Sequence, residues 1–273
     1  MIRERGGEFA ELSVERCCRA SAVPRSLVYR ALRRDSGGEL LEAVLCKLER
    51  FPCYGYRRIA AALGISLKTA RTFMRRHGLA RKRRVRSRPS SSSAFVPADA
   101  NFLPFVVVCG PGRVFASQVT YIRTHTGGWA YLAVVLDIFT RQVAGWAVSG
   151  RNDTTLTKAA LSKVFICGHL KPGWIHHSDR GSNYAAGAYQ ELVEDFKGLS
   201  SFSDPASPTQ NAYAESFFKT FKLEEANPQV YCDVYDAQMA CERYLDLYNK
   251  ERLHSSLGMK TPDQFHAEFL RAS

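Results

Sequence analysis

The sequence HHSDRGSNY occupies residues 176–184 and follows Trp174-Ile175, a short apolar run bounded on its other side by a Pro-Gly pair. Such a run predicts a buried strand, so Asp179 is expected just past the end of that strand. A second segment, NAYAESFF at residues 211–218, opens a helical pattern of apolar residues, and Glu215 falls in its first turns. One carboxylate after a strand and one on a helix can converge on divalent metal ions, as a two-metal phosphoryl-transfer site requires.

Segments rich in β-branched and aromatic residues precede these motifs and predict a sheet. Val114–Ile122, Trp129–Leu136 and Gln142–Val148 are separated by turn-forming residues, so we expect three consecutive antiparallel strands. The chain beyond them favours an alternation of helix and strand. In order, the expected elements are a helix from Asp153 to about Phe165, a strand at Ile175, a helix over 185–196, a strand over 199–202, the helix that carries Glu215, and a helix over 233–248. The pattern therefore predicts an α/β domain.

Three motifs in this order resemble the second-frame (OrfB) transposases of the bacterial insertion-sequence-three family. They are HHSDRGSNY, SPTQNAYAESFFKTFK at residues 207–222, and YLDLYNKERLHSSLGMKTPDQF at residues 244–265. The resemblance extends from about Glu39 to Phe265. It implies a retroviral-integrase-like (DDE) core of the ribonuclease-H-like fold, a mixed five-stranded sheet with helices, preceded by an all-α helix-turn-helix region. The implied chemistry is DNA cleavage and strand transfer, dependent on two Mg²⁺ or Mn²⁺ ions.

The resemblance also implies which residues bind the metal ions. In the family, an Asp on the first core strand, the Asp of the HSDRG motif and the Glu of the NAxxES motif do so, and the last two map onto Asp179 and Glu215. Thr120-Tyr121-Ile122 fix the register of the first strand, so Gln118 stands where the family has its first catalytic Asp. A carboxylate supplies negative charge and two oxygens that can bridge cations about 3.5–4 Å apart, whereas a Gln amide offers one neutral oxygen. The sequence therefore predicts a weakened metal site.

Two further residues bear on this departure. If Thr124–Gly128 form the hairpin turn, Gln118 lies opposite Val135, and Asp137 is a diagonal neighbour on the same face that could substitute for the missing acid. The preferred interpretation is that Asp137 instead structures the turn that follows it. Gln210 stands where the family usually has an Asp, and two acids lost near one site favour a decayed or repurposed copy.

These observations leave three functional hypotheses open. The first is an insertion-sequence transposase that performs DNA integration and transposition, with the activity of this copy reduced or abolished by Gln118. The second is a catalytically dead, transposase-derived protein that binds insertion-sequence ends. The third is a host regulator that uses only residues 1–100 to bind DNA. The first two differ in whether a metal-dependent product forms.

The charge distribution indicates where a polyanion would bind. Among 273 residues, of which 45% are hydrophobic and 23% charged, residues 1–100 hold 22 Lys and Arg against 9 Asp and Glu, and residues 101–273 hold 16 against 17. The entire net charge of +12 therefore belongs to the first hundred residues, as expected when one region holds nucleic acid. The eight cysteines never form a C-x-x-C pair, so neither a zinc pattern nor a disulfide scaffold is indicated.

Two helical regions make up the basic part. Residues 11–34 read as helix, turn and helix, ended by Asp35-Ser36-Gly37-Gly38, and fit either a small helix-turn-helix or an ordinary helical hairpin. Glu39–Phe51 is an amphipathic helix, followed by a short helix at Arg57–Leu63, a turn in which Ser66 is the N-cap, and a helix at Leu67–His77. This second region resembles the family's helix-turn-helix, and the residues expected to contact DNA are Lys68, Arg71, Arg75 and Arg76.

A charge run separates these helices from the core. Arg81, Lys82, Arg83 and Arg84 begin a basic, Ser-rich linker that is expected to track phosphates without reading sequence. Lys219 and Lys222, beyond Glu215, are candidate phosphate clamps, and neither His176 nor His177 is assigned as a metal ligand. The expected domains are a helix-turn-helix-like region 1–36, a helix-turn-helix region 37–80, the linker 81–104, the catalytic core 105–226 and a helical C-terminal extension 227–273.

The expected partners follow from the resemblance. They are double-stranded DNA, as terminal repeats and as target, further copies of this chain in a homo-oligomer on DNA, and an upstream-frame (OrfA) protein. No apolar run approaches the roughly 18 residues of a membrane span, and the N-terminus has no apolar signal-peptide core, so a cytoplasmic, nucleoid-associated protein is expected.

Overall fold

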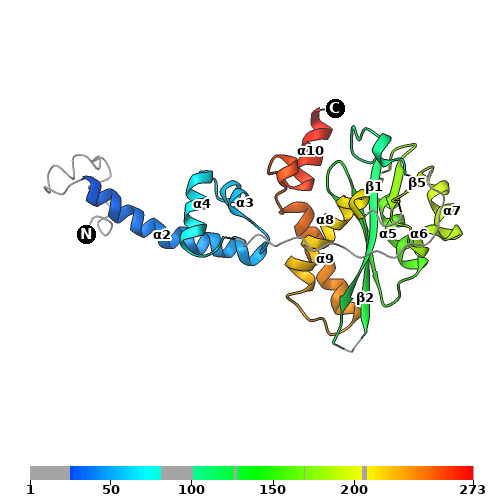
Figure 1. The fold of residues 1–273 in the computed structure, drawn as a ribbon, viewed down its shortest axis with the longest axis horizontal. Coiled ribbons are helices and arrows are strands. Elements are labelled where there is room, and N and C mark those ends of the chain that lie inside the picture. Colours follow the sequence, from blue (N-terminus) through cyan, green and yellow to red (C-terminus); the bar gives the residue numbers. More distant parts are fainter. Residues whose placement is uncertain (1–24, 81–100, 126–127, 169, 205–207, 273) are drawn as a thin grey trace. The chain divides into compact units, whose positions relative to one another are not determined.

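The computed structural model describes residues 25–80, 101–125, 128–168, 170–204 and 208–272, with side chains from residue 38 onward except at 208 and 209. The chain divides into two compact units, Met1–Arg50 and Phe51–Ser273, which are considered separately. Figure 1 shows the course of the chain. None of the described helices has both the length and the apolar character that crossing a membrane requires.

In the first unit, one long helix replaces two predicted elements. Helix α2 runs without interruption from Arg25 to Arg50, so the predicted helix end at Asp35–Gly38 is wrong. An interior glycine costs only about 1 kcal/mol relative to alanine, and the Gly-Gly pair is not followed by a proline, so it weakens the helix without ending it. The expected boundary between regions 1–36 and 37–80 therefore lies inside a helix. The first helix of the predicted N-terminal pair lies outside the described residues.

The second unit begins with two short helices whose ends match the sequence signals. Helix α3 spans Tyr56–Leu63 and ends at Gly64, which has a φ of 63° that favours glycine. Helix α4 spans Leu67–Arg76, and the Oγ of its N-cap Ser66 accepts a hydrogen bond from the Thr69 N–H at 3.0 Å. This cap is the one expected from the sequence.

A five-stranded mixed sheet forms the centre of the second unit. Its strands are β1 (Val114–Arg123), β2 (Trp129–Asp137), β3 (Val143–Ser149), β4 (Ile175–Ser178) and β5 (Leu199–Phe202). Their order in space is β3-β2-β1-β4-β5. The β3–β2 and β2–β1 pairs are antiparallel, and the β1–β4 and β4–β5 pairs are parallel. This arrangement confirms the expected ribonuclease-H-like fold.

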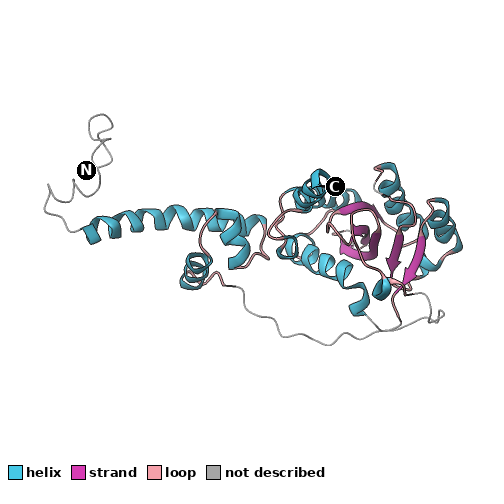
Figure 2. Ribbon diagram, turned by 90° about the horizontal axis from the view of Figure 1, so that it is seen from above, coloured by secondary structure: helices cyan, strands magenta, loops and turns pink. Residues whose placement is uncertain are grey.

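Helices lie on both sides of the sheet (Figure 2). They are α5 (Thr154–Ile166), α6 (Ser182–Ala185), α7 (Gly187–Asp195), α8 (Ala212–Phe221), α9 (Val234–Lys250) and α10 (Pro262–Ala272). Short helical turns are η2 (Leu103–Phe105), η3 (Pro208–Asn211), η5 (Ser255–Leu257) and the π-helical η4 (Lys222–Ala226). Asp153 caps α5 through its side chain, as the sequence indicated, and the Asp233 side chain caps α9 in the same way.

The two faces of the sheet have separate hydrophobic cores. On one face, Phe115 packs with residues of α5 and α7 in a buried cluster that also contains Trp174. On the other face, Val134 and Leu136 pack with aromatic residues of α8 and α9. Because successive residues of a strand point to opposite faces, this alternation directs Gln118 to the α8 side of the sheet. The fold thereby sets Gln118 on the same side as Glu215.

Candidate active site at the ends of β1, β4 and α8

The first two predicted site positions lie on adjacent strands. β1 and β4 pair in parallel from Val114 opposite Ile175 to Ser117 opposite Ser178. Gln118 and Asp179 are the next residues of these two segments, so they follow the last paired residues at the same level of the sheet. Asp179 comes directly after the end of β4, as predicted.

The third position is held against β1 by the start of α8. Ala214 packs with Val114 and Ala116 in one buried cluster, and the Asn211 side-chain Nδ2 donates a hydrogen bond to the Ser117 backbone oxygen at 3.1 Å. Glu215 lies in the first turn of α8. These contacts fix that turn against the part of β1 that contains Gln118, so all three predicted positions gather at one region of the sheet.

The two carboxylates lie at the surface but are partly desolvated. Neighbouring protein atoms raise the pKa of Asp179 and, by the same cause, the pKa of Glu215. The backbone N–H of Gly181 donates a hydrogen bond to Asp179 Oδ1 at 3.1 Å, which lowers the pKa of Asp179 by less than burial raises it. A cation bound between the carboxylates would favour their charged forms and reverse these shifts.

The Gln118 amide is the unusual member of the group. Its Oε1 is buried without a hydrogen-bond partner, and the Asn211 Oδ1 nearby on the same face is in the same situation. A buried acceptor without a donor costs about 1–3 kcal/mol, so each oxygen would gain from a bound cation or donor. Asp179, Glu215 and Gln118 thus offer oxygen ligands of the kind that Mg²⁺ accepts, with one negative charge fewer than three carboxylates would give.

The site differs from a complete metal-binding triad in having two carboxylates in place of three. Within the described part of the chain, no group of three or more His, Cys, Asp or Glu side chains is placed to hold a metal ion. An aspartate at position 118 would have supplied the third carboxylate. The donor set is thus two carboxylates and one neutral amide oxygen, whose chemistry suits a divalent cation but supplies one negative charge fewer than a complete triad.

Asp137 is not a substitute for the missing acid. Gln118 pairs with Val134, not Val135, because the ladder begins at Arg123 opposite Trp129. A slip of one residue moves a side chain to the other face, and Asp137 accordingly pairs with Phe115 on the opposite side of the sheet from Gln118. The predicted diagonal contact is therefore wrong.

The preferred interpretation of Asp137, as a turn-forming residue, is confirmed. Its buried carboxylate accepts hydrogen bonds from the backbone N–H groups of Gly112 at 2.6 Å, Phe139 at 2.7 Å and Thr140 at 3.0 Å. Oδ1 shapes the turn between β2 and β3, and Oδ2 holds the segment that precedes β1. Asp137 thus has a full structural role.

Gln210 also has a structural role in this chain. Its Oε1 accepts hydrogen bonds from Asn101 Nδ2 at 2.8 Å and from the Asp204 N–H at 2.5 Å, while its Nε2 donates to Asp204 Oδ2 at 2.6 Å. An aspartate here would place a second carboxylate beside Asp204 and would lack the donor. The glutamine therefore ties the segments at residues 101 and 204 to η3.

Both histidines of the first motif face the interior. His176 Nε2 is hydrogen bonded to Ser117 Oγ at 2.8 Å and to Tyr189 Oη at 2.9 Å, and both ring nitrogens of His177 contact serine hydroxyls of Ser201 and Ser203. Burial lowers the pKa of His176 to about 3 and the pKa of His177 to about 4. Both rings are thus neutral at pH 7, and within the described part of the chain their hydrogen bonds go to serine and tyrosine hydroxyls, not to Asp179.

The cationic residues singled out from the sequence occupy different places. Lys219 is exposed on α8, and the Nζ of Lys222 lies 4.5 Å from the centre of the Tyr121 ring. The four α4 cations, Lys68, Arg71, Arg75 and Arg76, are all exposed. The linker cations Arg81, Lys82, Arg83 and Arg84 lie outside the described residues.

The third motif contributes contacts that sequence reasoning did not assign. Asn249 bonds with both the N–H and the carbonyl of Val143, at 2.9 and 3.0 Å, and so continues the edge of β3. Arg252 forms a bidentate pair with buried Glu224, at 2.9 and 3.0 Å. The spacing Tyr-Asn-x-x-Arg-x-His was visible in the sequence, but its partners lie on η4 and β3, which no local signal identifies.

Comparison with known proteins agrees with this architecture. Models of the integrase core domain match residues 110–208 and residues 199–262. The chain is 30% identical, over 94% of its own length and 94% of the relative, to transposase InsF for insertion sequence IS3A of Escherichia coli (strain K12). The chain belongs to the IS3-family insertion-sequence transposases. It is thus a member of the DDE-type transposase and integrase enzymes, whose established process is DNA transposition.

Two other similarities add detail. Over 57% of this chain, the sequence is 35% identical to the transposase for insertion sequence element IS904 of Lactococcus lactis subsp. lactis (strain IL1403), and the chain spans 61% of that relative. Among solved structures, the HTLV-2 integrase catalytic core domain in complex with magnesium aligns with a TM-score of 0.43 and 17% identity. That alignment covers 58% of this chain and 98% of the viral domain.

Proposed function

We propose that this transposase cleaves and joins DNA strands at insertion-sequence ends, at a metal centre of Asp179 and Glu215 in which Gln118 is a neutral third oxygen ligand. The observation that supports the proposal is the gathering of these three positions where β1, the end of β4 and the start of α8 meet. The unpartnered Gln118 oxygen gives that third ligand a free lone pair.

Each residue has a defined part in this proposal. A bound divalent cation would stabilise the negative charge that develops on the attacking and leaving oxygens of a phosphodiester. Asp179 and Glu215 would hold it as anions, and Gln118 would orient it without adding charge. Lys219 and Lys222 would supply positive charge to neighbouring phosphates of the strand.

The missing charge has a calculable consequence. At an effective dielectric constant of 20, unit charges 4 Å apart attract by roughly 4 kcal/mol, and each 1.4 kcal/mol changes an equilibrium about tenfold. Restoring a carboxylate at position 118 should therefore lower the metal concentration needed for half-maximal activity by at least about tenfold. The same argument predicts that Gln118 slows the reaction of the natural chain.

The helix-turn-helix region would hold the DNA. Four exposed cations on α4, a helix fixed at its start by the Ser66 cap, support contact with a DNA groove or its phosphates. The basic linker would add affinity that depends on salt and not on sequence. Relatives are named as transposases of insertion sequences, so terminal repeats are the proposed DNA, bound by more than one copy of this chain.

The deciding experiment measures strand cleavage and joining on a labelled insertion-sequence end over a range of Mg²⁺ and Mn²⁺ concentrations. It compares the natural chain with Gln118→Asp, with Gln118→Asn as the neutral control of the same shape, and with Glu215→Gln as the inactive control. We expect product from the natural chain at high metal concentration, more from Gln118→Asp, and no gain from Gln118→Asn. Equal metal dependence of the natural chain and Gln118→Asp would contradict the assigned role of Gln118.

The natural glutamine at position 118 also favours a second candidate function. If Gln118 removes too much charge for any turnover, the chain is a DNA-end-binding protein that does not cut. Product from Gln118→Asp alone, with equal DNA binding by both chains, would establish this second function. Absence of product from both would place the loss of activity elsewhere in the chain.

A further inference from the structure

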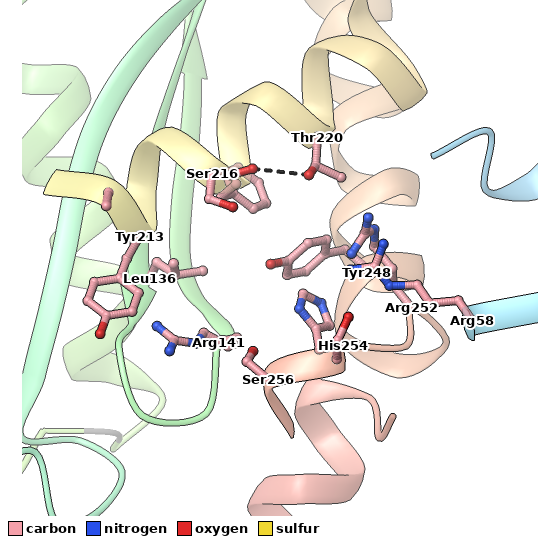
Figure 3. Close-up of a pocket in the computed structure, with 13 residues that line it drawn as sticks. Arg58, Leu136, Arg141, Tyr213, Ser216, Thr220, Tyr248, Arg252, His254 and Ser256 are labelled. Carbon is pink, nitrogen blue, oxygen red and sulfur yellow. Dashed lines mark hydrogen bonds between the residues drawn. The ribbon is translucent and has the colours of Figure 1, made fainter. Parts of the chain in front are cut away.

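A cavity of about 430 Å³ lies on the side of α8 next to the one that carries Glu215 (Figure 3). Its walls come from α8, the turn between β2 and β3, the end of α9 with the segment that follows it, and Arg58 of α3. Ser216, the residue after Glu215, lines it, and Figure 3 shows Arg141 below Tyr213 on one flank and Arg252 beside Arg58 on the other. Consecutive helix residues are rotated by about 100°, so the cavity and Glu215 occupy neighbouring faces of one helix.

Positive charge is concentrated in this cavity. Three arginines line it, Arg58, Arg141 and Arg252, and the described residues that line it include no Asp or Glu. Glu224 lies outside the lining and is already engaged by Arg252 through two hydrogen bonds. The charges of the other two arginines therefore face the cavity without a carboxylate.

Three buried nitrogens of the residues that line the cavity lack hydrogen-bond partners. Arg58 Nε, Arg141 Nη1 and His254 Nε2 are each buried without a hydrogen-bond partner. An arginine N–H can only donate, so a buried one without an acceptor is costly, and an anion with several oxygens would satisfy both guanidinium groups together. Guanidinium groups match the oxygens of a phosphate in geometry as well as in charge.

Local structure holds these donors in place. Arg141 adopts a φ of 63°, which a non-glycine residue rarely does, in the turn that the Asp137 hydrogen bonds shape. Its guanidinium carbon lies 4.0 Å from the centre of the Tyr213 ring. Burial, and to a smaller degree the charges of Arg252, Arg58 and Arg141, lower the pKa of His254 to about 3.

We propose that this cavity binds one phosphate group of a DNA strand whose neighbouring phosphate lies at the Glu215 site. Arg58 and Arg141 donate to the phosphate oxygens, the Ser216 and Ser256 hydroxyls add further donors, and the Tyr213 ring offers an apolar surface to the adjoining sugar or base. The assignment of the phosphate to DNA rests on the proposed function, whereas the expectation that the cavity binds a phosphate group rests on its lining residues alone. A free nucleotide or inorganic phosphate has the same chemistry and is the competing source.

The DNA arm of the test measures binding without catalysis. Fluorescence anisotropy of a labelled insertion-sequence end is recorded in EDTA against NaCl concentration, with all chains carrying Glu215→Gln, so loss of cleavage cannot affect the result. Arg141→Gln and, separately, Arg58→Gln are compared with Arg151→Gln, which removes an exposed arginine that does not line the cavity. We expect each cavity variant to bind about 5- to 20-fold more weakly and to reduce the slope of log K against log salt by about 1. The Arg151→Gln control should lie within twofold of its parent.

The phosphate arm identifies the source. The unfolding midpoint is measured with inorganic phosphate or deoxyadenosine monophosphate against chloride at constant ionic strength, for the natural chain and for Arg141→Gln. Stabilisation of the natural chain that Arg141→Gln loses, together with the DNA effect, supports the proposal. Stabilisation by phosphate with unchanged DNA affinity in both cavity variants overturns the DNA assignment.

Two outcomes overturn the whole inference, whatever the cleavage assay gives. One is an unchanged affinity and salt slope in both Arg58→Gln and Arg141→Gln, with no phosphate stabilisation of the natural chain. The other is an equal loss in Arg151→Gln, which would show a general charge effect. Since Arg58 and Arg141 lie on separate elements, misfolding of one variant leaves the other as the test.

Discussion

Breaking the buried ion pair between Glu224 and Arg252 should lower the free energy of unfolding of the second unit more than breaking an exposed ion pair would. The side chains are 0% and 3% exposed, and Arg252 donates to both carboxylate oxygens, at 2.9 and 3.0 Å. The Tyr244 hydroxyl donates to the same carboxylate at 3.0 Å. Glu224 belongs to the π-helical turn η4, so the pair joins that turn to the segment after α9.

The magnitude follows from desolvation. Arg252→Met removes one partner and leaves the Glu224 charge buried with only the Tyr244 hydroxyl, which should cost about 3–5 kcal/mol of unfolding free energy. For a unit of this size that is a fall in Tm of roughly 10 °C. The double variant Glu224→Leu with Arg252→Met leaves no unpaired charge, so it should be more stable than either single variant.

The assay is guanidinium denaturation followed by tryptophan fluorescence, since all three tryptophans lie in the second unit. Lys250→Met serves as the matched control, because its pair with Asp246 is exposed at 61% and 59% and should leave the midpoint unchanged. A cost below about 1 kcal/mol for Arg252→Met would refute the reasoning. So would a double variant whose loss equals the sum of the single losses.

Three further predictions concern other parts of the chain. Burial lowers the pKa of His176 to about 3 in the folded chain, against 6.5 in the unfolded chain. As the pH falls below 6.5, the proton therefore binds the unfolded chain in preference to the folded chain. Through this group, the free energy of unfolding should drop by about 2 kcal/mol between pH 6.5 and pH 5. His176→Gln should show a flatter pH profile in denaturation experiments, and an unchanged slope would contradict the buried neutral ring. Gly145→Ala should lower the free energy of unfolding by at least about 2 kcal/mol, because its Cβ would lie 2.3 Å from the Ala160 carbonyl oxygen. An unchanged denaturation midpoint would refute that steric limit. Lys68→Gln and Arg71→Gln should each reduce the salt slope of DNA binding by about 1 in anisotropy titrations, and slopes equal to that of the natural chain would remove α4 from the DNA interface.

The sequence determined the elements whose ends depend on nearby residues. Caps at Ser66 and Asp153 were identified from the sequence because an N-cap side chain bonds the backbone only two or three residues away. The first three strands were predicted from segments rich in β-branched and aromatic residues between turn signals, which are likewise local features of the chain. The motif residues Asp179 and Glu215 were found from their surroundings in the chain, and their places after β4 and in the first turn of α8 agree with the expectation.

Tertiary structure decided what depends on residues far apart. A difference of one residue in the register of the β1–β2 hairpin places Asp137 on the face opposite Gln118. Helix α2 continues through Gly37-Gly38 because the small free-energy cost of the two glycines is outweighed by the stability of the rest of the helix. The cavity draws Arg58, Arg141 and His254 from segments up to 196 positions apart. No local pattern encodes such a meeting, since only the packing of distant elements brings those charges together.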